Sequence, residues 1–263
     1  MSEPLSRQTP SAQPPSSPDW QYRPAADLGL GPVERLRSIK REQGLISWSV
    51  HHAALGSLRA YLQIYHRFTV VGREHLPRQT PFVLIANHAS HLDALILAAA
   101  LPRAVATSAF PVAAGDVFFE SPARSAFAAV FLNALPLWRK KATGHALEDL
   151  RTRLLEGPTG LILFPEGARS RDGAMLPFKP GIGRIIAQTS VPVVPCRLEG
   201  AFEAMRPGTW LPRPRRITVR VGPALTFEDE VLFPATREGY GAIAGKLREA
   251  VGGLGRERGA DPR

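Results

Sequence analysis

Short apolar runs alternate with helical patterns along most of this chain, and this alternation restricts the fold more than any other feature. Runs rich in β-branched and aromatic residues predict strands at 68–71, 82–86, 132–138, 161–164, 191–198 and 217–221. Helical periodicity predicts helices near 91–101, 118–130, 144–156, 181–189 and 238–250. Strands that alternate with helices favour an α/β fold. We therefore expect a mixed, largely parallel sheet flanked by helices.

Both ends of the chain differ in composition from this alternating part. Residues 1–30 hold six prolines and five serines without apolar periodicity, which predicts a disordered tail and offers no apolar stretch for a secretory signal. From about Gly252 the chain is rich in glycine and arginine, and we expect a loose tail over 252–263. Between the tails we expect a helical segment over 31–66 and one folded domain over 67–251.

The stretch from Leu45 to Tyr65 has the period of an amphipathic helix. Leu55, Leu58 and Leu62 fall with Tyr65 on one helical face, and basic residues precede the stretch within 35–41. Two histidines and one arginine lie inside it, so we predict no conventional membrane-spanning helix. Two interpretations remain open: the apolar stripe packs on the folded domain, or the helix lies in a membrane interface.

The charge balance is strongly basic. The chain has 263 residues, with 33 Lys+Arg against 23 Asp+Glu and a formal net charge of +10. Residues 1–30 contain two arginines and three acidic residues, so the excess belongs to the folded part. Such a charge suits nucleic acid, an anionic membrane or acidic substrates. Cys196 is the single cysteine, which excludes a disulfide scaffold.

A polar cluster follows the predicted strand 82–86 and precedes an apolar helix. We expect Ser90 to cap that helix, with Asp93 three residues later as its capping-box partner. The turn lets Asp93 approach the ring of His88, and a carboxylate on one ring nitrogen leaves the other free as a general base. A purely structural capping role fits the same residues. His91 adds a third potential metal ligand, but no second cluster supports it and we expect no metal.

A second polar cluster follows the predicted strand 161–164. The sequence from Pro165 to Arg171 contains an acid, a glycine and two arginines, and arginines are bidentate donors to phosphate. Glu166 can accept from a substrate hydroxyl or orient an arginine. The stretch from Lys179 to Gly183 opens the next helix and can add backbone donors to an anion site. A solvated basic loop is the alternative.

Taken together, the motifs resemble those of the glycerolipid acyltransferase family, typified by bacterial 1-acyl-sn-glycerol-3-phosphate acyltransferases. The Asn-His-x4-Asp block of the family matches Asn87, His88 and Asp93, and its Phe-Pro-Glu-Gly-x-Arg-Ser block matches Phe164 to Ser170. A strand ending in arginine resembles Leu135 to Arg139, and a Val-Pro-Val-x-Pro strand matches Val191 to Pro195. Order and spacing also fit, and the resemblance covers roughly residues 65–225, within the acyltransferase domain predicted over 67–251.

The resemblance implies transfer of an acyl chain from acyl-CoA or acyl-carrier protein to a lysophospholipid hydroxyl, most simply 1-acyl-sn-glycerol-3-phosphate. His88 is then the general base, assisted by Asp93. The resemblance implies substrate binding by Asn87, Arg139, Glu166, Gly167 and Arg169, with the two arginines on the acceptor phosphate. We expect direct transfer without an acyl-enzyme, because Cys196 lies in a Val/Pro-rich strand and no Gly-x-Ser-x-Gly elbow occurs.

The same resemblance implies the partners and the location. We expect no cofactor besides the acyl donor substrate, and peripheral association with the cytoplasmic face of an anionic membrane. The segment 31–66 would be the part at that membrane interface. Ala168 stands where the family commonly has threonine, and Trp138 where it often has a small polar or acidic residue. Both positions bear on the identity of the acceptor, and another lyso-lipid or a lyso-aminolipid is the alternative.

A nucleic-acid-binding module is the alternative from another functional class. The densest basic stretch contains Arg206, Arg213, Arg215, Arg216 and Arg220. Trp210 is the single aromatic residue available there for base stacking, and the sequence has no zinc or helix-turn-helix signature. We therefore expect no nucleic acid as a partner, and interpret the stretch as a solvated rim or as a contact with anionic lipid or CoA phosphates.

Overall fold

The computed structural model describes residues 25–42, 44–138, 144–209 and 211–255. Within these residues one eight-stranded sheet has the order β1-β7-β6-β2-β5-β3-β4, and β8 pairs with β6. The strands are β1 (Thr69–Val71), β2 (Phe82–Ala86), β3 (Ala109–Ala114), β4 (Leu135–Leu137), β5 (Gly160–Leu163), β6 (Thr189–Glu199), β7 (Thr218–Val221) and β8 (Leu225–Phe227).

The sheet is mixed and largely parallel, as the alternating pattern predicts. β2 pairs in parallel with both β5 and β6, β3 pairs in parallel with β5 and β4, and β7 runs antiparallel to β6. All five residues of β2 are buried. A parallel strand covered on both faces needs a continuous apolar run, which explains the sequence Phe-Val-Leu-Ile-Ala.

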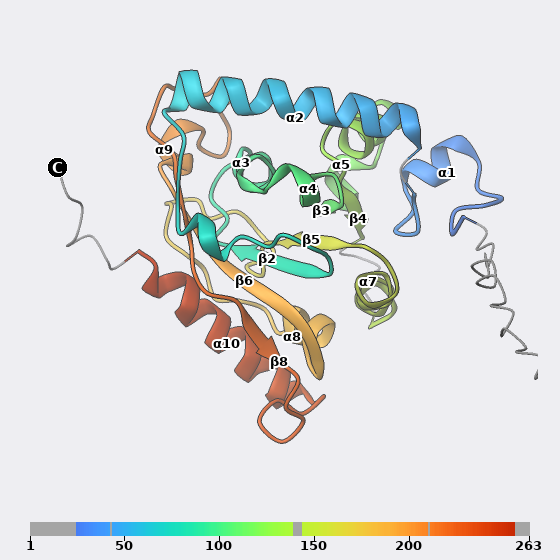
Figure 1. The fold of residues 1–263 in the computed structure, drawn as a ribbon, viewed down its shortest axis with the longest axis vertical. Helices are drawn as coiled ribbons and strands as arrows, with labels where there is room; N and C mark the ends of the chain where they lie inside the picture. The colour runs from blue at the N-terminus through green and yellow to red at the C-terminus, as the bar shows by residue number, and fades with distance from the viewer. Residues whose placement is uncertain (1–24, 43, 139–143, 210, 256–263) are drawn as a thin grey trace, which may run out of the picture.

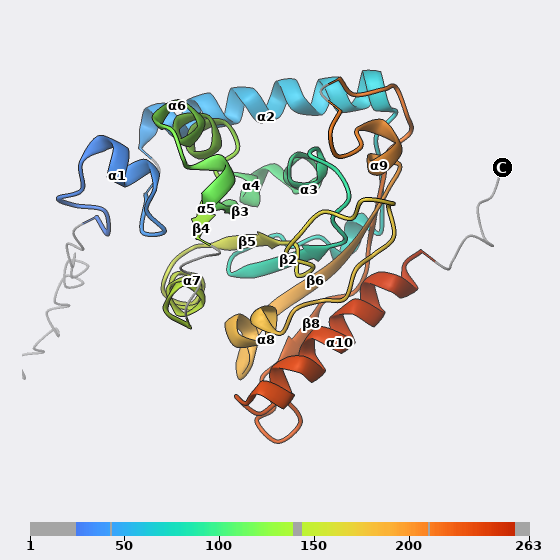
Figure 2. The ribbon, with the colours of Figure 1, turned by 180° about the vertical axis from the view of Figure 1, so that it is seen from behind.

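Helices cover both faces of the sheet (Figures 1 and 2). The helices in the described residues are α1 (Pro32–Leu36), α2 (Leu45–His66), α3 (Asp93–Ala100), α4 (Arg103–Ala106), α5 (Gly115–Phe118), α6 (Pro122–Ala126), α7 (Gly144–Glu156), α8 (Gly181–Ile186), α9 (Ala201–Ala204) and α10 (Arg237–Gly253). The short segments are η1 (Arg73–His75) and the π-helical η2 (Phe127–Phe131).

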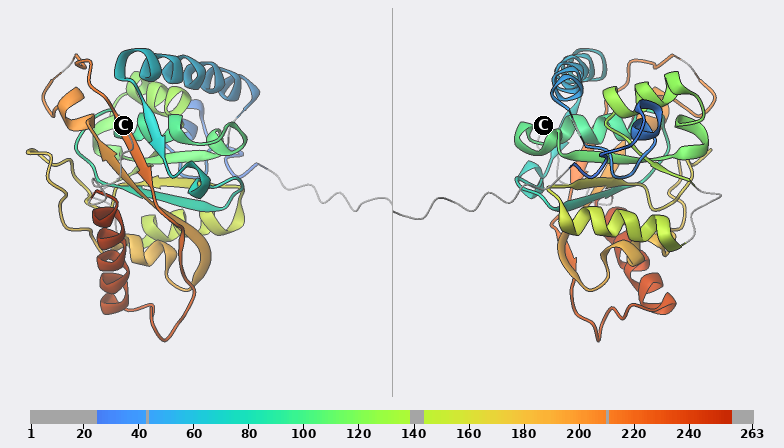
Figure 3. Two further views of the ribbon diagram at one scale, coloured as in Figure 1. Left: turned by 60° about the vertical axis from the view of Figure 1, so that its left-hand side comes forward. Right: turned by 90° about the vertical axis from the view of Figure 1, so that its right-hand side faces the viewer.

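The side chains of β2 divide the core into two apolar layers. Phe82 and Leu84 point into a cluster shared with α2 and α3, whereas Val83 and Ile85 point into a cluster shared with α7, α8 and α10. Figure 3 shows from two sides the helices that cover these layers, and α2 is the outermost element on its face of the sheet. Successive strand residues face opposite sides of a sheet, so the buried strand supplies both layers at once.

Several element boundaries differ from the sequence prediction. The expected helix over 118–130 is divided into α5, α6 and η2, because Pro122 can only begin a helix and Ser121 caps that new start by accepting from the Arg124 N–H. The expected strand 132–138 is shorter, because Leu132 caps the π-helical turn and Asn133 has a left-handed φ of +52°, so neither residue is extended. The helix expected over 91–101 begins at Asp93, and that over 181–189 ends at Ile186 because Thr189 already belongs to β6.

The amphipathic stripe of α2 packs on the folded domain, which supports the first of the two interpretations for this helix. Leu55 and Leu62 are 5% and 0% exposed and join the same core as α3. Other apolar residues of α2 remain outside, with Leu45 84% and Ile64 83% exposed. In the part of the chain that the structure describes, none of the helices combines the length and hydropathy that a membrane span requires.

Candidate active site

His88 and Asp93 come together where β2 ends and α3 begins. The Nδ1–H of His88 donates to Oδ2 of Asp93 over 2.9 Å. The same oxygen accepts the backbone N–H groups of Ala89 and Ser90, at 2.7 and 2.8 Å. Because a carboxylate only accepts, Nδ1 must carry the ring proton and Nε2 is left with a free lone pair.

Half of the predicted capping box forms around Asp93, and the helix starts later than expected. The Ser90 N–H donates to Asp93, but the hydroxyl of Ser90 accepts from the N–H of Leu92 over 3.2 Å and not from that of Asp93. The regular helix nevertheless begins at Asp93 itself, with Leu92 as N-cap. Ser90 also donates to the carbonyl of Met205 over 2.9 Å, which ties the turn to α9.

The environment of the His88 ring fixes its plane. The side chain of His88 is 22% exposed while that of Asp93 is 1% exposed, so the base reaches solvent and its partner does not. The ring of Phe164 stacks on it with centroids 4.2 Å apart and planes 21° apart. Phe164 lies in the same motif as Glu166, but no role was predicted for its side chain from the sequence.

Asn87 joins the end of β2 to β6 through its side-chain amide. Its Nδ2 donates to the carbonyl of Leu198 over 3.1 Å, and its Oδ1 accepts the Leu198 N–H over 2.8 Å. The side chain is 7% exposed. This expected substrate-binding residue therefore lies beside His88 with its amide already bonded to the main chain of β6.

Glu166 lies beneath the turn that joins β2 to α3 rather than on its surface. It is 2% exposed. Its Oε1 accepts the His88 N–H over 2.8 Å and its Oε2 accepts the Leu176 N–H over 3.0 Å. Burial raises the pKa of this carboxyl group, and the two backbone hydrogen bonds oppose that shift.

Gly167 turns the chain away from Glu166 in a conformation that favours glycine. Its φ is +69°, and a Cβ atom there would lie 2.8 Å from Nζ of Lys179. The Gly167 N–H donates to the carbonyl of Phe164 over 3.0 Å. A side chain at this position would both strain the turn and displace the lysine.

Arg169 reaches back over the turn and contacts His91. Its Nη1 donates to Nε2 of His91, which sequence reasoning had considered only as a metal ligand. Burial lowers the pKa of the Arg169 guanidinium, and the carboxylate of Asp93 opposes the shift. Burial, followed by Arg169, lowers the pKa of His91 and keeps that ring neutral at physiological pH. The structure thus brings Arg169 to the turn that joins β2 to α3, whereas Arg139 lies outside the described residues.

Two cavities adjoin this region. A polar cavity of about 240 Å³ is bordered by Asn87, Ala89, Asp93 and the start of α9. An apolar cavity of about 140 Å³ lies between α2, α3 and η2. It is lined by His51, Ala54, Leu55, Leu58, Ala94, Leu95, Ala98, Pro111, Phe127, Phe131 and Leu132.

The described residues include the single cysteine, a serine beside His88 and further potential metal ligands. Cys196 is completely buried, and burial raises the pKa of its thiol to about 12. Ser170 lies near His88, but its hydroxyl donates to Asp172 and not to the imidazole. Across the ranges that the structure covers, no group of three or more His, Cys, Asp or Glu side chains is arranged to hold a metal ion.

Comparison with known proteins identifies the family. The chain is 29% identical over 192 residues to a 1-acyl-sn-glycerol-3-phosphate acyltransferase from Limnanthes douglasii, covering 70% of the chain and 66% of that protein. It is 35% identical over 133 residues to the human 1-acyl-sn-glycerol-3-phosphate acyltransferase alpha, covering 49% of the chain and 44% of that protein. The chain thus spans less than two thirds of the length of these relatives.

A solved structure shares the fold. The crystal structure of the 1-acyl-sn-glycerophosphate acyltransferase PlsC from Thermotoga maritima aligns with a TM-score of 0.62 and 22% identity, covering 80% of this chain and 81% of the other. The family model described as Acyltransferase matches residues 67–199, which contain both the His88–Asp93 pair and the Glu166–Arg169 turn. By that match over half of its length, this chain belongs to the acyltransferase family.

Proposed function

We propose that this protein transfers a fatty acyl group from an acyl thioester to the free hydroxyl of a lysophospholipid, with 1-acyl-sn-glycerol-3-phosphate as the acceptor. The His88–Asp93 pair carries the proposal, because its hydrogen bond leaves Nε2 of a partly exposed imidazole free as a base. Two relatives are named as 1-acyl-sn-glycerol-3-phosphate acyltransferases, which agrees with this reaction. Another lyso-lipid remains the alternative acceptor.

The proposed mechanism is direct transfer. Nε2 of His88 takes the proton of the acceptor hydroxyl while the hydroxyl oxygen attacks the thioester carbonyl carbon. The tetrahedral intermediate collapses, the carbon–sulfur bond breaks, and the imidazolium returns its proton to the leaving thiolate. Asp93 stabilises the imidazolium through the 2.9 Å hydrogen bond. General-base catalysis of this kind contributes about 10²–10⁴-fold, and holding both substrates together supplies much of the rest.

Arg169 is the described residue best placed to bind the acceptor phosphate. It contacts His91, three residues from the catalytic base, and guanidinium groups bind phosphate oxygens in a bidentate manner. Lys179 lies against Gly167 on the same turn and adds positive charge. The proposal assigns Arg139 to the same phosphate from its place in the family motif.

The donor acyl chain is proposed to enter the apolar cavity between α2, α3 and η2. Ala94 and Leu95 line this cavity and directly follow Asp93 in α3. Aliphatic and aromatic walls suit an alkyl chain, since burial of each methylene stabilises binding by about 0.8 kcal/mol. The donor is acyl-CoA or acyl-carrier protein, and no cofactor is required.

The protein is further proposed to bind peripherally to the cytoplasmic face of an anionic membrane through α2 and its neighbours. Arg59, the one Lys or Arg within α2, points inward and donates to the carbonyls of Ala99 and Leu101. The exposed outer positions of α2 are therefore uncharged, unlike those of an ordinary surface helix.

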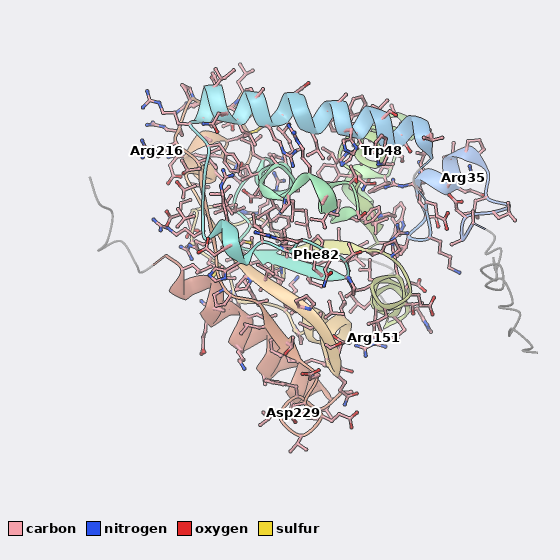
Figure 4. The ribbon with its side chains drawn as sticks, in the orientation of Figure 1. Arg35, Trp48, Phe82, Arg151, Arg216 and Asp229 are labelled. Carbon is pink, nitrogen blue, oxygen red and sulfur yellow. The ribbon has the colours of Figure 1, made fainter. Side chains whose placement is uncertain are left out.

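Exposed apolar residues surround that neutral surface. We call the following set the α2 face: the outer side of α2 with Leu45, Trp48, Ile64 and Tyr65, together with Phe127, Phe131 and Leu211. Three exposed arginines, Arg213, Arg215 and Arg216, belong to the segment beside the C-terminal end of α2, where Tyr65 donates to the carbonyl of Pro212 and His66 is bonded to that of Arg215. Figure 4 shows Arg216 at this end of the helix. Apolar side chains rimmed by arginines suit the interface of an anionic bilayer.

An acceptor screen tests the proposed reaction. The purified chain is incubated with lysophosphatidate, other lysophospholipids and a lyso-aminolipid, together with mixed acyl-CoA thioesters, and the products are identified by mass spectrometry. The proposal predicts phosphatidate as the main product and a matching release of free thiol. Acylation of another acceptor alone would support the alternative, and thiol release without any acylated lipid would contradict acyl transfer.

A further inference from the structure

Glu166 holds two segments of the active site together through the main chain. One of its oxygens accepts from His88 on the turn after β2, and the other accepts from Leu176 on the loop after β5. In the sequence, His88 lies 78 residues before Glu166 and Leu176 lies 10 residues after it. With the side chain only 2% exposed, little of it remains open to a bound substrate.

The same two segments meet at two further points around His88. The Ser170 N–H donates to the carbonyl of His88 over 2.8 Å, and the Phe164 ring stacks on the imidazole. The main chain of His88 is therefore bonded on both sides by the segment 164–176, its N–H to Glu166 and its carbonyl to Ser170. Asp93 fixes the other edge of the ring.

Removal of the Glu166 carboxylate would free the His88 and Leu176 amides together. A buried N–H without a partner costs about 1–3 kcal/mol, so the two segments would move to find new partners. That movement shifts His88 relative to Arg169, which lies within the 164–176 segment. Catalysis is sensitive to such shifts, since a displacement of about 1 Å costs roughly 10²-fold in rate.

We infer that Glu166 is a positioning residue that holds the catalytic His88 and the Arg169 loop in register, and that it does not bind the acceptor itself. This inference rests on the proposed function for its kinetic consequence. It replaces the substrate contact that the sequence motif alone indicates, because both oxygens of the carboxylate are already bonded to backbone amides.

The Glu166→Gln variant tests the inference kinetically. Glutamine keeps the size of the side chain but turns its amide NH2, a donor, toward one of the two backbone N–H groups, so one hydrogen bond is lost. We expect kcat to fall about 10²-fold with the acceptor KM nearly unchanged. The exposed acid Glu249 of α10 supplies the matched control Glu249→Gln, which should behave as wild type. A raised acceptor KM with kcat retained would overturn the inference.

A double-mutant comparison separates positioning of His88 from an independent role in catalysis. If Glu166 acts through His88, then Glu166→Gln should lower activity in the wild-type background but cause no further loss in a His88→Ala background. Equal fractional losses in both backgrounds would contradict the inference.

Amide hydrogen exchange provides a readout that does not depend on activity. In Glu166→Gln, peptides covering 87–92 and 170–176 should exchange faster than in wild type, while peptides from α10 should be unchanged. Unchanged exchange at both sites would overturn the inference even in an inactive protein. An inactive wild type with the expected exchange would instead contradict the proposed function. Should Glu166→Gln not fold, Glu166→Asp, which is too short to reach both amides, serves for the same measurements.

Discussion

The chemistry of His88 depends on which of its ring nitrogens carries the proton. Oδ2 of Asp93 accepts from Nδ1 and from two backbone amides, so it fixes the tautomer and the turn with one atom. The sequence predicted this pair from the Ser90–Asp93 spacing, because a capping box is local. It did not predict that Glu166 accepts the His88 N–H. That contact requires a loop 78 residues further along the chain to fold back onto the turn.

Asp93→Asn tests the electrostatic part of the pair. The amide oxygen of asparagine can still accept the Ala89 and Ser90 N–H groups, but it carries no charge to stabilise the imidazolium. We expect kcat to fall about 10²–10⁴-fold with little change in thermal stability. Steady-state rates and a thermal melt measure both effects. A variant with wild-type kcat would contradict the assigned role of Asp93.

Arg169→Ala tests the phosphate contact. Loss of a charge-assisted hydrogen bond costs about 1.5–3 kcal/mol, so the acceptor KM should rise roughly 10–100-fold. The thioester KM should change far less, and Arg171→Ala, an exposed arginine two residues away, supplies the control. Comparable increases in both KM values would argue against a specific role for Arg169 in acceptor binding.

At the scale of elements, strands and helices with strong patterns were predicted well and weak ones were missed. β2 and α7 have the predicted boundaries, since their apolar runs and periodicity are clear. β3 was missed because Ala-Phe-Pro-Val-Ala-Ala has one β-branched residue and a proline, and it is a strand through its pairing with β5 and β4. β8 is three residues long and depends on β6 in the same way.

The sequence pattern did not predict the π-helical turn of η2, which shapes the surface beside α2. It places Phe127 and Phe131 in a stacked pair with centroids 5.5 Å apart, both exposed beside α2. The carbonyl of Phe131 is bonded to Nδ1 of His51 over 2.9 Å, so α2 and η2 enclose the apolar cavity together. This cooperation between distant segments has no local sequence signal.

Ala98→Leu tests the cavity as the acyl-chain site. Ala98 lies on α3 and is 5% exposed, so a larger side chain there fills space that the alkyl chain is proposed to occupy. We expect a shift in preference toward shorter acyl chains by about tenfold, since one misfitting methylene is worth about 1–3 kcal/mol. Competition between thioesters of different length measures this shift. As a control, Ala242→Leu at an exposed position of α10 should leave the preference unchanged. An unchanged preference in Ala98→Leu would contradict the cavity assignment.

At the scale of the molecule, the exposed arginines after α9 and the α2 face lie side by side. The loop after α9 carries Arg213, Arg215 and Arg216 beside the end of α2, and Ser90 of the catalytic turn bonds to Met205 at the end of α9. The catalytic turn therefore adjoins the surface proposed to contact lipid. Arg220, from the same basic stretch, is instead paired with Glu199 at 3.2 Å.

Vesicle binding tests this surface. In sedimentation assays with anionic vesicles, Leu45→Glu and Ile64→Glu should each weaken binding about tenfold or more, because each loses burial worth roughly 1.5–3 kcal/mol. Val231→Glu is the matched control. Val231 is 90% exposed near Asp229, on the opposite side of the molecule from α2 (Figure 4). Equal losses in all three variants, or binding that is insensitive to salt, would contradict docking through the α2 face.

His88→Ala provides the most direct test of the account, whose central claim is that His88 deprotonates the acceptor in a direct transfer. The rate of phosphatidate formation from 1-acyl-sn-glycerol-3-phosphate and acyl-CoA should fall about 10²–10⁴-fold, with the thermal melt unchanged. His75→Ala, in the short η1 segment, should keep wild-type activity. An active His88→Ala variant, or a covalent acyl-enzyme trapped from wild type, would contradict the claim.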